Sequence, residues 1–167
     1  MLDALAADGP HPDHADKLML FGQFVGSWDF DGFYTAPDGA RVDTSGEWHF
    51  GWVLAGRAIQ DVLICPRRDA AGPNLEYGST VRFYDPSIDA WQITWITPPQ
   101  RAVVRLVARP VGDEIVLEGP GADGLLRWTF SSIAPEAFTW RGHRSTDGGV
   151  TWRQREEMRL RRQRLSG

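Results

Sequence analysis

Apolar and polar residues alternate with a period of two along most of the chain, as they do in β-strands that bury one face. Trp28 and Phe30, for example, alternate with Ser27, Asp29 and Asp31. The alternation resumes after segments rich in Gly, Pro, Asp and Ser, which favour turns. We therefore expect about ten strands, near residues 27–34, 47–54, 58–65, 77–84, 91–97, 101–109, 114–118, 125–132, 137–144 and 150–162.

A helical pattern appears only near the N-terminus. Two prolines indicate that residues 1–13 form a flexible arm. Asp13 is then placed to cap a short helix over about 14–23, whose buried side would carry Leu18 and Phe21.

The connections between the expected strands are short, which fixes the type of sheet. No helix fits between consecutive strands, so neighbouring strands should be antiparallel. Ten such strands in an open sheet would expose two edges, and closing the sheet removes both. The sequence thus predicts an all-β fold: a single up-and-down antiparallel β-barrel of about ten strands with a short N-terminal helix, spanning residues 14–167.

Composition narrows the class of protein further. A chain of 167 residues with 42% hydrophobic and 24% charged residues has the apolar content of one folded domain and not of a disordered protein. Its apolar runs are far shorter than the roughly 20 residues of a membrane helix. The first twenty residues lack the features of a secretory signal, and a single cysteine cannot form an internal disulfide. We therefore expect a cytoplasmic protein that does not act in a membrane.

Arginine is concentrated near the C-terminal end. Six Arg lie within residues 153–164, but they alternate with apolar residues, as on the solvated face of a strand. This pattern argues against a nucleic-acid partner. Exposed strand faces carrying Arg and Glu are compatible with a homodimer.

The chain has eight Trp, eight Phe and three Tyr, more Trp than a core of this size needs. If the bulky residues face inward, polar residues on the same faces mark a binding site, because a buried polar group needs a partner or a ligand. Ser79 and Thr97 are such residues. The candidate ligand-binding residues are Tyr34, Trp48, Trp52, Asp61, Trp95, Trp140, Gln154 and Glu156.

The choice of inward face decides this assignment, because a shift of one residue inverts a whole strand. The aromatic pattern favours an assignment in which Trp side chains face inward (the Trp-in assignment) for the expected strands at 47–54, 91–97 and 137–144. The strands at 58–65 and 125–132 are ambiguous. With the opposite parity the interior would receive His49, Arg82, Arg105, Arg127, Arg141 and His143.

Gly26-Ser27-Trp28, placed directly after the expected helix, resembles the G-x-W signature of the calycin superfamily, which includes the lipocalins and the fatty-acid-binding proteins. The resemblance implies a Trp28 that plugs the barrel floor, with Arg159 or Arg161 of the last strand packed across it. The overall plan is most similar to the fatty-acid-binding proteins, the nitrobindins and bacterial lipocalin-like families of unknown function.

These relatives carry different ligands. Fatty-acid-binding proteins hold a carboxylate with internal Arg residues, and nitrobindins bind haem through a late His. His143 is the one candidate here for that His. The cofactor, if any, stays unknown.

Residues 145–152, Ser-Thr-Asp-Gly-Gly-Val-Thr-Trp, resemble the Asp-box of sialidase propellers. A propeller repeats this motif in at least four blades, and one copy in this chain cannot build one. We interpret the motif as a local hairpin turn, in which Asp147 binds turn amides and two glycines allow positive φ.

The sequence supports three hypotheses. The first is a barrel that binds a small, largely apolar molecule with an acidic or aromatic group. The second is an enzyme of isomerase, hydratase or cyclase type that uses a buried Asp or His as its acid or base. The third is a barrel packed solid that acts through its surface. No spacing of His, Cys and carboxylates predicts a metal site.

Overall fold

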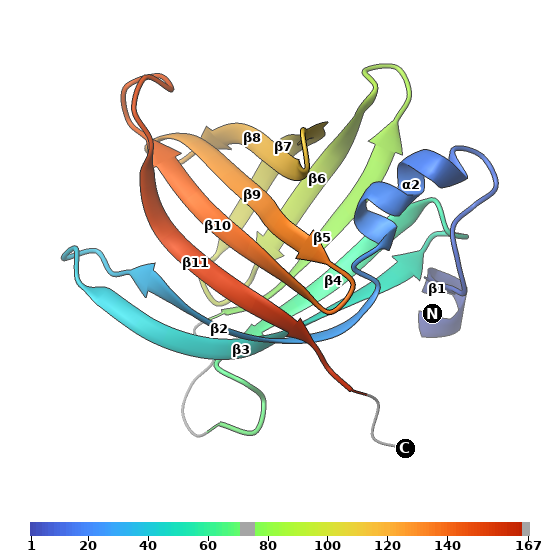
Figure 1. Cartoon of the computed structure of the whole chain (residues 1–167), viewed down its shortest axis with the longest axis horizontal. Helices are drawn as coiled ribbons and strands as arrows, with labels where there is room; N and C mark the ends of the chain where they lie inside the picture. Colours follow the sequence, from blue (N-terminus) through green and yellow to red (C-terminus); the bar gives the residue numbers. More distant parts are fainter. Residues whose placement is uncertain (71–75, 165–167) are drawn as a thin grey trace.

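The computed structural model describes residues 1–70 and 76–164, and its main body is a closed barrel (Figure 1). Each strand pairs antiparallel with the next, and β2 also pairs with β11, so ten strands close the barrel. This confirms the expected all-β barrel. The ten strands are β2 (Gly26–Thr35), β3 (Arg41–Val53), β4 (Ala58–Cys65), β5 (Glu76–Asp85), β6 (Ala90–Thr97), β7 (Ala102–Val111), β8 (Glu114–Gly121), β9 (Gly124–Ala134), β10 (Ala137–Ser145) and β11 (Arg153–Arg162).

The N-terminal segment contains more regular structure than its prolines suggest. It forms a helical turn, α1 (Leu2–Leu5), and a short strand, β1 (Ala6–Ala7), which pairs with the end of β3. The expected helix is α2 (Ala15–Gly22). The expected cap at Asp13 is wrong: the N-cap is His14, which has a left-handed φ of 60° and makes no side-chain cap hydrogen bond.

The helix α2 closes one end of the barrel, where it packs on β4 and β5 (Figure 1). Phe21 of α2 and Phe24, just beyond it, are almost completely buried. Their rings lie 5.7 Å from Phe130 and 4.6 Å from Phe138, respectively. These rings form a solid aromatic floor, which positions any cavity in the other half of the barrel.

The G-x-W motif lies at this floor. Trp28 is fully buried, and the guanidinium of Arg162 lies 4.1 Å above its ring. Gly26 has a φ of 129°, and a Cβ there would come within 2.7 Å of Arg162 Nη1. The residue packed across Trp28 is therefore Arg162, and the expectation of Arg159 or Arg161 is wrong because both pair with acidic groups on the outer face.

The ambiguous strands are now assigned. In β4, Asp61 is buried and Leu63 lines the interior. In β9, Trp128 and Phe130 face inward. Both strands therefore follow the Trp-in parity.

The interior face of β5 is the reverse of what its apolar residues suggest. Tyr77 and Phe83 are 41% and 47% exposed, whereas Arg82 is buried. Two contacts fix this register: the ring of Trp95 occupies the space where a Cβ of Gly78 would stand, and Arg82 forms a buried salt bridge with β4. The interior position expected for Ser79 is therefore wrong, and its hydroxyl instead bonds the β4 backbone and Gln60.

The loop between β10 and β11 has the expected Asp-box geometry. Asp147 Oδ1 accepts hydrogen bonds from the Ser145 hydroxyl (2.7 Å) and the Thr151 amide (2.9 Å). The indole N–H of Trp152 donates to the carbonyl of Gly149 at 3.1 Å. Hydrogen bonds from the Thr151 hydroxyl, the Thr151 amide and the Ser145 hydroxyl hold the pKa of Asp147 well below its usual range, so the carboxylate stays ionised as the centre of a tight turn.

Candidate functional site

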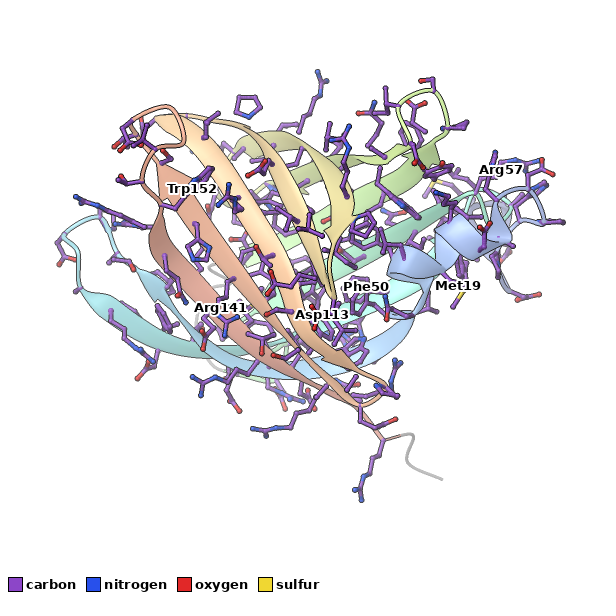
Figure 2. The ribbon with its side chains drawn as sticks, turned by 45° about the horizontal axis from the view of Figure 1, so that its top comes forward. Met19, Phe50, Arg57, Asp113, Arg141 and Trp152 are labelled. Atoms are coloured by element: carbon purple, nitrogen blue, oxygen red, sulfur yellow. The ribbon has the colours of Figure 1, made fainter. Side chains whose placement is uncertain are left out.

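A cavity of about 1490 Å³ fills the half of the barrel away from α2. It reaches the surface between the β2–β3, β6–β7, β8–β9 and β10–β11 turns, whose residues form its rim. Figure 2 shows Trp152 beside the β10–β11 loop at this end and Met19 on α2 at the other. The barrel thus has one closed end and one open end.

Aromatic side chains form much of the inner wall. The ring of Trp140 lies 6.4 Å from Trp48 and 5.6 Å from Trp128. Trp48 in turn lies 5.7 Å from Phe130 of the floor. Trp95 lines the wall on β6. Such a surface offers both apolar area and ring faces to a flat ligand.

The deep end of the cavity contains a buried ion pair. β5 runs from the rim to Tyr84, whose ring lies 5.3 Å from His14 beside α2, so Arg82 lies at the deep end. Arg82 Nη2 binds Asp61 Oδ2, and both residues are at most 2% exposed. Asp61 Oδ1 accepts a hydrogen bond from the Thr80 amide at 2.8 Å.

Three donors near this ion pair lack an acceptor. Arg82 Nε, Arg82 Nη1 and the indole nitrogen of Trp48 are buried and have no hydrogen-bond partner among the described residues. Arg82 and Trp48 both line the cavity. A buried donor without a partner costs about 1–3 kcal/mol. The deep end therefore favours a ligand atom that accepts hydrogen bonds.

Two carboxyl groups lie nearer the rim. Glu156 lines the cavity, and burial raises the pKa of its carboxyl. Glu76 also lines the cavity and has its pKa raised by burial, while it accepts hydrogen bonds from Thr97 and, at 2.7 Å, from Gln100. The charge of Glu76 raises the pKa of Glu156 further.

Five of the eight sequence-predicted site residues line the cavity: Tyr34, Trp48, Trp95, Trp140 and Glu156. Trp52 does not, because its ring packs at the floor against Gly22 of α2. Asp61 is engaged by Arg82 and is absent from the cavity lining.

The interior position expected for Gln154 is wrong. A β-bulge shifts the register, so that Gly142 pairs with Glu156 but His143 pairs with Gln154. Glu156 therefore faces inward, and Gln154 binds Glu157 on the outer face. Trp152 is one of the bulky residues that the Trp-in assignment places inside, and this expectation is also wrong, because its ring stacks with Arg127 on the outer face.

The sequence interpretation missed Arg82 as a site residue, although the alternative parity contained it. Four other members of that set face outward: His49 bonds Ser27 and Glu47, Arg127 pairs with Glu118, Arg141 pairs with Glu157, and Arg105 is exposed. The only available signal was a charged residue between Val81 and Phe83 on β5.

His143 stands directly opposite Arg127 in the β9–β10 ladder, yet it is among the residues that line the cavity near its mouth. Its Nδ1 is buried and has no hydrogen-bond partner among the described residues. Burial and the charges of Arg127 and Arg141 lower its pKa. Of the four histidines, all of them within the described residues, His143 alone lines the cavity. Haem ligation through His143 therefore stays a prediction.

Within residues 1–70 and 76–164, no cluster of three or more His, Cys, Asp or Glu side chains has the arrangement of a metal site. No helix in the same part of the chain has the length and apolar character needed to span a bilayer.

The closed barrel, its helical plug and its one-ended cavity define a calycin-like fold. Among solved structures, the barrel is similar to Rv2717c from M. tuberculosis, with a TM-score of 0.62 and 17% identity over 93% of this chain and 99% of that one. It is also similar to the S-type phycobiliprotein lyase CPES from Guillardia theta, with a TM-score of 0.61 and 12% identity over 89% and 93% of the two chains. No family model and no curated protein matches the sequence.

Proposed function

We propose that this protein binds a small, largely apolar or aromatic molecule in the cavity between the aromatic floor and the rim. The observation that carries the proposal is the cavity itself, which is open at one end and walled by Trp48, Trp95, Trp128 and Trp140. Its volume of about 1490 Å³ exceeds the roughly 300–1,000 Å³ of typical small-molecule sites. That volume argues against a barrel packed solid.

The direct test is titration with N-phenyl-naphthylamine, a neutral aromatic probe that fluoresces when it leaves water. We expect a saturable rise in fluorescence with one site per barrel. The matched variants are Leu63→Trp, which narrows the cavity from β4, and Val62→Trp, which adds the same side chain to the opposite face of that strand. Leu63→Trp should weaken binding of the probe and Val62→Trp should keep it.

Two results would contradict the proposal. One is a folded wild-type protein that gives no saturable signal. The other is equal binding by both Trp variants, which would place the probe on the outer surface. Circular dichroism of each variant checks that the barrel is intact.

A second candidate function, an enzyme of isomerase, hydratase or cyclase type on the same scaffold, is favoured by Glu156. Its enclosed carboxyl has a raised pKa, as a general acid requires, and it touches the cavity. Asp61 suits this role less because it is paired with Arg82. Glu156→Gln would abolish turnover of a substrate while keeping its affinity, whereas a pure binding protein would show a change in affinity alone.

A further inference from the structure

The deep end of the cavity combines free donors with a charge that is already neutralised. Arg82 offers Nε and Nη1, and Trp48 offers its indole N–H, without an acceptor among the residues described. All three are donors. A ligand that enters this end gains hydrogen bonds only if it brings an oxygen or nitrogen with a lone pair.

The charge of Arg82 is balanced within the protein. Its Nη2 binds Asp61, which is 1% exposed and also held by the Thr80 amide. The faces of Phe21 and Phe50, at 5.2 and 5.1 Å, enclose the guanidinium. A carboxylate placed here would add an uncompensated negative charge to a dry site, close to the Asp61 carboxylate and to the negative ring faces.

In the opposite orientation a carboxylate would leave the deep donors of Arg82 and Trp48 without an acceptor. Its charged group would then lie beside Glu156 and Glu76, two carboxyls that line the cavity. Arg144 and Arg155 partly offset the charge of Glu156, since both lower its pKa. Arg101 and Arg153 also line the cavity toward its mouth, so a carboxylate drawn to these arginines would lie away from the deep end.

We propose that the cavity selects aromatic ligands that carry a neutral acceptor, such as a carbonyl, and that Arg82 and Trp48 bind this acceptor at the deep end. Aromatic carboxylates are discriminated against. This inference rests on the proposed function and narrows it, because it removes acidic ligands from the class.

The test compares two probes with the same aromatic body, pyrenebutanamide and pyrenebutyrate, by tryptophan-to-pyrene energy transfer at neutral pH. The amide should bind more tightly, on the order of tenfold, because the carboxylate leaves one buried charge uncompensated. Asp61→Asn then gives the decisive readout, because it keeps the shape of the site but removes the negative charge that neutralises Arg82. In this variant the preference for the amide should vanish or reverse. Asp43→Asn, on an exposed side chain of β3, is the matched control and should leave the preference unchanged.

A second variant covers the case in which Asp61→Asn does not fold. Trp48→Phe removes the indole donor while it keeps an aromatic ring, and it should weaken amide binding several-fold. Trp152→Phe, on the outer face, is its control and should have no effect.

The outcomes separate this inference from the function on which it rests. If pyrenebutyrate binds the wild-type protein as tightly as the amide, or if folded Asp61→Asn keeps the wild-type preference, the inference is overturned while binding stands. Equal amide affinity in Trp48→Phe and the wild type overturns it as well. If neither pyrene probe nor N-phenyl-naphthylamine binds, the proposed function itself fails.

Discussion

Replacing Arg82 by Met should destabilise the barrel severely, because the change removes one partner of a buried ion pair. Arg82 and Asp61 are 2% and 1% exposed, so neither charge is accessible to bulk water. Loss of one member of such a pair costs about 3–5 kcal/mol, since the remaining charge stays buried without its partner. For a chain of this length, each kcal/mol lowers Tm by roughly 2–4 °C. The expected fall in Tm is therefore about 6–20 °C.

The double variant Arg82→Met, Asp61→Leu tests the physical reason for this cost. It removes both charges and fills the space with apolar atoms, so the ionic loss should largely disappear. The Thr80 amide loses its acceptor, which costs about 1–3 kcal/mol. The double variant should thus be more stable than Arg82→Met alone.

Urea denaturation followed by tryptophan fluorescence gives the free energies for a double-mutant cycle. Met19→Leu replaces one exposed apolar side chain on α2 by another and is the control variant, which should leave the urea midpoint unchanged. The reasoning is refuted if Arg82→Met lowers the free energy of unfolding by less than about 1 kcal/mol. It is also refuted if the double variant loses as much free energy of unfolding as the single variants Arg82→Met and Asp61→Leu together.

Three further predictions concern titration and reactivity. Hydrogen bonds from Arg68 lower the pKa of Glu47 from 4.5 to about 2, so this group stabilises the fold above pH 4.5, and that stability is lost as pH falls toward 2. Urea midpoints across this window should therefore fall less in Glu47→Gln than in the wild type, and an equal fall would contradict the assignment. Burial raises the pKa of Glu156, so its effect on the pH dependence of stability has the opposite sign: the wild type should lose stability as pH rises above 4.5. The variant Glu156→Gln should lose less stability over this range. The control Glu118→Gln, on the outer face, should follow the wild type. Cys65 lines the cavity, and burial raises the pKa of its thiol, so iodoacetamide should label it slowly near neutral pH and more slowly still when a probe is bound. Mass spectrometry measures the labelling rate. A rate that a saturating probe does not change would contradict the position of Cys65 in the cavity.

The architecture was predictable because it depends on local patterns. Period-two alternation and short turns predict ten antiparallel strands, and closure follows from the need to remove sheet edges. The Asp-box turn was equally local, since all of its hydrogen bonds join residues 145–152. Sequence is informative wherever the interacting groups are neighbours in the chain.

The candidate site was only partly predictable, because its key contacts join distant residues. Asp61 was recognised as a buried acid, but its partner Arg82 lies 21 positions away on a strand whose apolar residues face solvent. Gln154 was assigned to the wrong face because a bulge of one residue in β11 has no signature in the alternation. In the same way, the Arg packed on Trp28 could be placed on the last strand but not at Arg162 itself.

The pairing of β2 with β11 constrains when the barrel can form during synthesis. Phe30 stands opposite Leu160, so the seam joins segments about 130 residues apart in the chain. A ribosome must translate nearly all of the described chain before β2 finds this partner, and until then one edge of β2 is unpaired. Such a contact is slow to form because its loop-closure entropy must be overcome first. Pairing with β3 covers only the other edge of β2, so this edge stays exposed to neighbouring chains until β11 is in place.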